Sequence, residues 1–188
     1  MATTNRRTVT PGACTACVKL NIAVSSSQSY RHVVLSVLSA RRSKFISSRM
    51  ADSAIAALQA TALTARCHNS FFRQKQLKAL HDALRQDSNT IKDAIKSDTR
   101  VSEPEATTEV ALALDLVKEH YSSINHAKEL EEEYQIANGK NASNHTEPWG
   151  VVYIEPQQSH TPFYSVIAAL SAALAAGNCV ALKVSLFP

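Results

Sequence analysis

A strand, a helix and a second strand follow one another over residues 150–185, and this order constrains the fold more than any other feature. "GVVYIEP" is a short β-branched run bounded by Gly150 and Pro156, which is typical of a buried strand. "PFYSVIAALSAALAAG" begins with Pro162 and ends at Gly177, the residue types expected just inside the start and just past the end of a helix. "CVALKV" gives the second buried strand. Such a βαβ unit requires parallel strands and a right-handed crossover.

Two parallel strands and one helix do not form a stable open sheet by themselves, because further strands are needed to bury their faces and edges. We therefore expect the chain to be the front portion of a larger α/β domain that is cut short at Pro188. The helix is apolar on nearly every face, so another element should cover its outer side. Its small side chains should let it approach the sheet closely; they are Ala168, Ala169, Ala172, Ala173, Ala175 and Ala176.

The segment before this unit has the periodicity of helices. Apolar residues recur at spacings that fit one helical face, at Leu77, Leu80, Leu84, Ile91 and Ile95. The polar stretch "QDSNT" interrupts the pattern. The spacing predicts a helical hairpin or a bent pair of helices.

A further helix is indicated by its start signals. Ser102 is a suitable N-cap, Pro104 lies in the first turn, and Glu105 stands three residues after the cap, where it can complete a capping box. We expect the charged residues of this helix, Glu109 among them, to lie away from its apolar stripe. The stripe consists of Ala106, Val110, Ala113, Leu114, Val117, Tyr121 and Ile124.

These patterns divide the chain into segments. The domain proper is expected over residues 51–188, with helices over 52–130 and a linker over 131–149 in which Gly, Pro and Asn residues mark turns. The βαβ unit follows over 150–185. The predicted fold class is α/β, with N-terminal helices followed by the first βαβ unit of an incomplete Rossmann-like domain.

The first 50 residues differ from the rest in charge. They carry eight Arg or Lys and no acidic residue, whereas residues 51–188 carry twelve basic and sixteen acidic residues. An acid-free leader rich in Ser and Arg is typical of a mitochondrial transit peptide. The alternative is an upstream extension wrongly included in the reading frame, since "MADSAIAALQA" from Met50 resembles an ordinary cytosolic start. The basic residues are scattered, without aromatic partners, so we expect no nucleic-acid partner.

The four cysteines suggest no site of their own. Cys14 and Cys17 form one C-x-x-C, without the second ligand pair of a zinc site or the strand and helix of a redox motif, so no metal is expected. Cys67 lies among the helices, and Cys179 begins a strand, where free cysteine behaves as a small apolar residue. No apolar run reaches the roughly 18–20 residues that span a bilayer. Reduced thiols suit an intracellular location, cytoplasmic or mitochondrial.

The C-terminal residues also carry a family pattern. "EPWGVVYIEPQQSHTPFYSVIAALSAALAAGNCVALKVS" resembles the start of the coenzyme-binding domain of aldehyde dehydrogenases, whose pattern runs E-P-x-G-V-V, W-N-x-P, an apolar helix, A-A-G-N-x-V and K-P-S-E. The preceding helices resemble the N-terminal helices of that family, closest to its fatty-aldehyde branch. The resemblance covers about residues 55–188 and implies that the chain is the N-terminal part of a Rossmann-like aldehyde dehydrogenase domain.

The resemblance implies where a coenzyme binds. The family lysine of K-P-S-E contacts the adenosine ribose hydroxyls, and Lys183 and Ser185 stand at the lysine and serine positions, as implied cofactor-binding residues. The carboxyl end of a buried strand is also where open α/β sheets bind ligands. The implied cofactor is NAD or NADP. The chain departs from the pattern at Val184 and Leu186, which replace the family Pro and Glu, and leucine cannot accept a hydrogen bond from a ribose hydroxyl.

No catalytic nucleophile is expected within the chain. Aldehyde oxidation in this family uses a cysteine thiolate and a glutamate general base, and both correspond to positions beyond Pro188. His160 in "SHTPF" aligns, across one extra residue, with the family Asn that stabilises the oxyanion. An imidazole can donate one hydrogen bond to such an oxygen. The alternative for His160 is an unrelated loop histidine.

Three functions remain open. The first is an aldehyde dehydrogenase-like oxidoreductase that oxidises an aldehyde to a carboxylate with NAD(P), present as a fragment that is inactive alone. Its full-length form would bind a small-molecule aldehyde and form a homodimer, and a C-terminal membrane anchor is left open. The second is a non-catalytic pseudoenzyme with a binding or assembly role, suggested by the replaced Asn and Glu. The third is a helical interaction module, against which the parallel strands argue.

Overall fold

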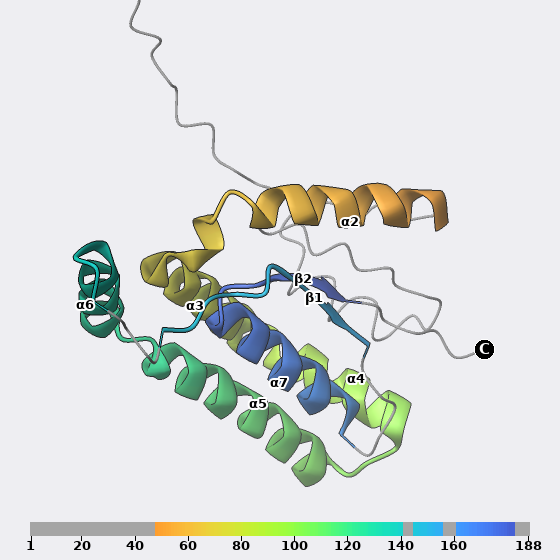
Figure 1. The fold of residues 1–188 in the computed structure, drawn as a ribbon. Helices are drawn as coiled ribbons and strands as arrows, with labels where there is room; N and C mark the ends of the chain where they lie inside the picture. The colour runs from red at the N-terminus through yellow and green to blue at the C-terminus, as the bar shows by residue number, and fades with distance from the viewer. Residues whose placement is uncertain (1–47, 141–144, 156–160, 183–188) are drawn as a thin grey trace, which may run out of the picture.

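The computed structural model describes residues 48–140, 145–155 and 161–182 (Figure 1). Most of this part of the chain is helical, and a short two-stranded sheet lies near its C-terminal end. The elements are α2 Ser48–Ala62, the 3-10 segment η2 Arg66–His68, α3 Ser70–Gln86, α4 Ser88–Thr99, α5 Glu103–Ser123, α6 His126–Ala137, β1 Val151–Ile154, α7 Pro162–Ala175 and β2 Cys179–Leu182.

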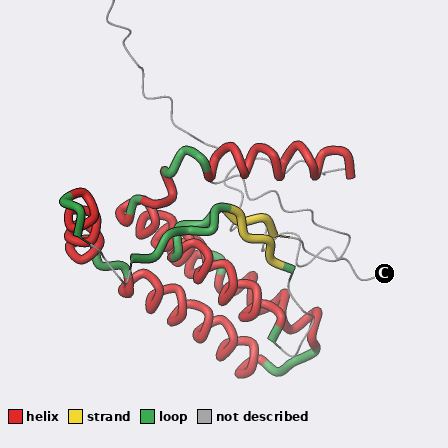
Figure 2. Tube along the Cα trace, in the orientation of Figure 1, coloured by secondary structure: helices red, strands yellow, loops and turns green. Residues whose placement is uncertain are grey.

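Helices cover both faces of the two-stranded sheet. Helix α2 lies on one face, and α7 lies on the other, with α3 beside it and α5 along its outer side (Figures 1 and 2). This arrangement satisfies the requirement that a parallel sheet be buried on both faces. It also provides the cover that the apolar surface of α7 demands. The predicted fold class, helices followed by a βαβ unit of an α/β domain, is confirmed.

Strands β1 and β2 pair in parallel, as the βαβ pattern predicts. Val151 pairs with Cys179 and Ile154 with Leu182, so the strands are in register along their whole length. Just before the first pair, the Cys179 N–H donates to the Gly150 carbonyl (2.8 Å) and the Gly150 N–H donates to Asn178 Oδ1 (3.0 Å). Asn178 is buried, so its side chain fixes the amino ends of both strands against each other.

The apolar face that the sequence predicts for α3 and α4 is buried and forms the core of the helical part. Five apolar side chains of these helices are buried: Leu77, Leu80, Leu84, Ile91 and Ile95. Only Asp87 separates the two helices, and its N–H still donates to the Ala83 carbonyl (3.1 Å) while its own carbonyl accepts from the Ile91 N–H (2.9 Å). Because the hydrogen bonding continues through Asp87, the segment is a bent pair of helices and not a hairpin.

Helix α5 begins as its sequence predicts. The Glu105 carboxylate accepts a hydrogen bond from the Ser102 N–H (2.8 Å) and another from the Ser102 hydroxyl (2.7 Å), which makes a capping box. Most of the predicted stripe is buried, although Leu114 is half-buried and Tyr121 is exposed. The stripe packs against α3, α4 and α7, so α5 joins the helical part to the βαβ unit.

The capping box should make stability depend on pH. The hydrogen bonds from Ser102, first that of its backbone N–H, hold the pKa of the Glu105 carboxyl below its ordinary value of 4.5. Because the folded state favours the charged form, the stabilisation is complete above pH 4.5 and is lost as pH falls through the folded pKa. Glu105→Gln should therefore lower the free energy of unfolding near neutral pH but have progressively less effect in acid. Urea unfolding of both proteins between about pH 7 and about pH 3 measures this, and a constant difference would contradict it.

Helix α6 corrects the predicted start of the linker. The sequence predicts a linker over 131–149, but α6 runs to Ala137. The Asn125 side chain caps its start by accepting from the Lys128 N–H (3.1 Å), and Gly139, with φ +72°, follows its end. None of its residues is buried, and its larger apolar side chains, Leu130, Tyr134 and Ile136, are exposed, so this helix packs little against the core.

Helix α7 ends in a Schellman motif. The Gly177 N–H donates to the Leu174 carbonyl (3.1 Å) and the Asn178 N–H donates to the Ala173 carbonyl (3.0 Å). Gly177 has φ +82°, which glycine adopts without a steric penalty. The predicted glycine stop is confirmed, and it turns the chain directly into β2.

Candidate functional site

The carboxyl ends of the two parallel strands meet at one edge of the sheet. Ile154 and Leu182 are paired there, and the chain enters α7 from the same end of the sheet (Figure 1). The Tyr153 hydroxyl donates to the exposed Glu155 carboxylate (3.1 Å) at this edge. Open α/β sheets bind ligands outside the carboxyl ends of their strands. We therefore take this edge, with the N-terminus of α7, as the candidate site.

The residues that the sequence singles out lie outside the described residues, next in the sequence to elements of this edge. His160 comes directly before Thr161, the N-cap of α7, and Lys183 comes directly after Leu182, the last residue of β2. Ser185 belongs to the same undescribed segment. The roles predicted for these three residues thus stay predictions.

A buried charged residue contacts the start of α7, where the sequence pattern predicts an exposed one. Glu109 of α5 is only 5% exposed, and its Oε1 accepts a hydrogen bond from the Tyr164 N–H (2.9 Å). The prediction that Glu109 lies away from the apolar stripe is wrong. Since residue 109 stands three positions after Ala106 and four before Ala113, it shares their helical face. That spacing was the signal by which Glu109 could have been found.

Glu109 replaces a local cap for α7. Within the described part, the Thr161 side chain makes no capping hydrogen bond to the first turn, and Pro162 has no N–H to satisfy. A carboxylate at a helix N-terminus also interacts favourably with the positive end of the helix dipole. The Tyr164 amide is therefore already bonded to an anionic group. An anionic ligand at this edge would have to be bound by other donors.

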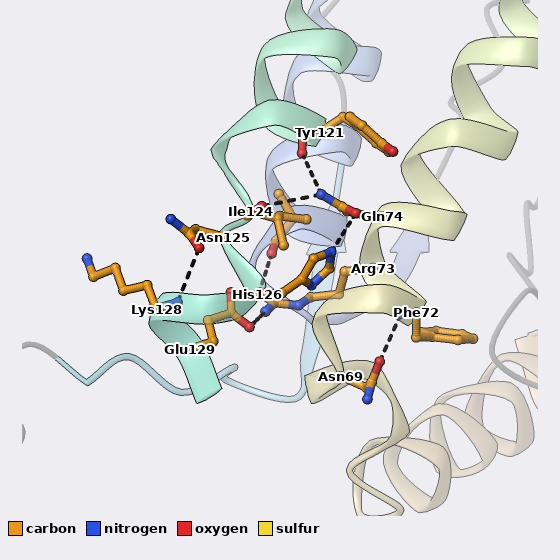
Figure 3. Close-up of polar contacts among 11 residues, drawn as sticks. Asn69, Phe72, Arg73, Gln74, Tyr121, Ile124, Asn125, His126, Lys128 and Glu129 are labelled. Carbon is orange, nitrogen blue, oxygen red and sulfur yellow. Dashed lines mark hydrogen bonds and ion pairs between the residues drawn. The ribbon is translucent and has the colours of Figure 1, made fainter. Parts of the chain in front are cut away.

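A second charged residue lies at the other end of α7. The Arg73 guanidinium of α3 donates through Nη1 to the Ala175 carbonyl (2.7 Å) and through Nη2 to the Glu129 carboxylate of α6 (Figure 3). Its side chain is 13% exposed. A cation that binds the last carbonyls of a helix complements the negative end of the dipole. Helix α7 thus has an acid at its start and a base at its end, each supplied by another helix.

Next to Arg73, a polar cluster closes the end of α5. The Gln74 side-chain amide donates to the Tyr121 and Ile124 carbonyls (3.3 Å each), and its oxygen accepts from His126 Nε2 (2.7 Å; Figure 3). The His126 ring stacks on Phe71 at a centroid separation of 3.8 Å. Each contact satisfies a helix terminus or joins α3 to α5 and α6. The cluster is therefore a structural joint between these helices.

The two described cysteines lie at the opposite edge of the sheet. Cys179 starts β2, and its Sγ lies 3.7 Å from the Sγ of Cys67. Cys67 is 8% exposed and Cys179 5%. A nucleophile must reach its substrate, and these buried thiols are at the amino end of the strands. Neither is placed to act at the candidate site.

The described residues show neither a metal centre nor a membrane span. No three His, Cys, Asp or Glu side chains in this part of the chain gather closely enough to hold a metal ion. Among its helices, none is long and apolar enough to cross a bilayer.

Comparison with protein families gives one result. The model of the aldehyde dehydrogenase family matches residues 40–187. Searches of curated proteins and of solved structures found no significant match.

Proposed function

The chain belongs to the aldehyde dehydrogenase family, and from this premise we propose that it carries the first part of the coenzyme-binding domain of an oxidoreductase that converts an aldehyde to a carboxylate with NAD or NADP. The observation that carries the proposal is the parallel pairing of β1 and β2 around α7 inside the matched region. This pairing creates the carboxyl edge at which such domains bind ligands.

The coenzyme contact that we propose is with the adenosine ribose. Lys183 directly follows the last residue of β2, so an ammonium group is supplied where strand β2 ends. The coenzyme phosphates have to be bound elsewhere, because the Tyr164 N–H at the start of α7 already donates to the Glu109 carboxylate. Leu186 stands where the family has Glu and can neither accept from a 2′-hydroxyl nor repel a 2′-phosphate. We therefore expect weak discrimination between NAD and NADP.

The chemistry requires residues that the described part of the chain does not place at the site. A bound coenzyme would supply the hydride acceptor. A thiolate must first attack the aldehyde carbon, and Cys67 and Cys179 are buried at the other edge of the sheet. We propose that the 188-residue chain alone has no aldehyde dehydrogenase activity and serves coenzyme binding.

Coenzyme binding tests this proposal. Calorimetric titration of the chain with NAD and with NADP should show binding of both, and Lys183→Ala should weaken each by about tenfold, as loss of a charged hydrogen bond implies. Lys118→Ala, which removes an exposed lysine from α5, is the matched control and should leave binding unchanged. Equal effects of the two substitutions, or no binding by the unmodified chain at millimolar coenzyme, would refute the assigned contact.

A pseudoenzyme is the second candidate, favoured by the replacement of the family Asn and Glu by His160 and Leu186. The two candidates differ in turnover. The longest natural form of the protein should reduce NAD or NADP in the presence of a fatty aldehyde if it is an enzyme. Coenzyme binding without turnover in that form would favour the pseudoenzyme.

A further inference from the structure

We propose that Cys67 and Cys179 form a redox-responsive pair that closes to an intrachain disulfide. The two Sγ atoms are 3.7 Å apart although the residues are 112 positions apart in the sequence. Neither cysteine is in a disulfide in the structure. They lie in a small apolar cluster with Leu58.

The backbones around the two cysteines are in close contact. Cys67 belongs to η2, the short connection between α2 and α3, and Cys179 begins β2 immediately after the Gly177 turn. A Cβ placed on Gly177 would lie 2.8 Å from the Cys67 carbonyl oxygen, so the two chain segments already touch. A disulfide needs an S–S distance of about 2.05 Å. Rotation of the side chains can supply most of the approach, since the segments need not travel.

The oxidant that we name is a hydroperoxide. One thiol attacks the peroxide, breaks its O–O bond and becomes a sulfenic acid, with release of water or an alcohol. The second thiol then attacks the sulfenic sulfur, the S–S bond forms, and the hydroxyl leaves as a second water. The two sulfurs lose two electrons in total, which the peroxide accepts. A small oxidant can arrive through η2, where Arg66 and His68 on either side of Cys67 are exposed.

The bond would join the helical part to the sheet. It would tie the α2–α3 connection to the amino end of β2, and the closed loop would span most of the described chain. Loops of this length stabilise strongly when cross-linked, because the unfolded chain loses many conformations. The carboxyl edge of the strands lies at the other end, so oxidation would stiffen the domain without closing the candidate coenzyme site.

Oxidation of the folded chain tests the pair. The 188-residue chain with Cys14→Ser and Cys17→Ser would be treated with a small excess of hydrogen peroxide in native buffer, and peptides would be mapped without reduction. We expect a linked Cys67–Cys179 peptide, the loss of two hydrogens from the intact mass, and a melting temperature higher by on the order of 5 °C that dithiothreitol reverses. A matched chain that also carries Cys67→Ala should show neither the link nor the rise.

Other outcomes would overturn the proposal. Both thiols retained after treatment, bridges between different chains, or separate sulfinic acids at the two positions would each show that the contact does not support a disulfide. The mapping decides the question even for a variant that melts without a clear transition, since it measures the bond directly. It is also independent of coenzyme binding, so its failure leaves the proposed function untouched.

Discussion

Gly177→Ala is expected to lower the free energy of unfolding by about 3 kcal/mol or more. Gly177 has φ +82°, where a side chain costs about 1–2 kcal/mol. The added Cβ would also lie 2.8 Å from the Cys67 carbonyl oxygen and 3.0 Å from Pro148 Cγ. The carbonyl is backbone held in η2 and cannot rotate away, so the turn or the whole η2 segment has to shift. Urea unfolding followed by far-UV circular dichroism measures the loss.

Gly139→Ala is the matched control for this prediction. Gly139 also follows a helix and has a similar φ of +72°, but a Cβ there would meet no atom within 4 Å. Gly139→Ala should therefore lower the free energy of unfolding only by the cost of a side chain at positive φ, about 1 kcal/mol. A Gly177→Ala loss no larger than that of Gly139→Ala would show that contact with η2 contributes nothing.

The second large effect is expected at Glu109. Glu109→Ala should lower the free energy of unfolding by about 2 kcal/mol, because it removes a charged hydrogen bond to the Tyr164 N–H and a favourable charge at the start of α7. Glu109→Gln keeps an acceptor of the same shape and should lose less than half of that. Both values follow from urea unfolding at neutral pH.

Glu119→Ala provides the comparison for Glu109. Glu119 is an exposed carboxylate on the same helix, so its substitution makes the same change in helix propensity without loss of a buried contact. Its effect should lie within about 0.5 kcal/mol of zero. If the two alanine variants are equally stable, the contact with α7 does not stabilise the fold.

Features that depend on neighbours in the sequence were predictable. Ser102 and Glu105 form their capping box over four residues, and Pro162 and Gly177 delimit α7 by their own backbone preferences. The spacing of Leu77 and Ile91 likewise reflects one buried face. Each of these signals is local, and the structure confirms each.

Features that depend on contacts between distant helices were not predictable in the same way. Arg73 binds the end of a helix 102 positions away in the sequence. The residues next to Arg73 in the sequence give no indication of that partner. Helix α6 buries none of its residues, so no buried face marks where it ends. Of the candidate site, the strand edge follows from the βαβ pattern, whereas Lys183, Ser185 and His160 rest on the family resemblance because they lie outside the described residues.

The two ends of α7 bind charged side chains of opposite sign from other helices. Arg73 and Glu109 belong to α3 and α5. These two side chains present an acid to the first turn of α7 and a base to its last turn. The polarity of these two contacts would allow α7 to dock in one direction and disfavour the reverse.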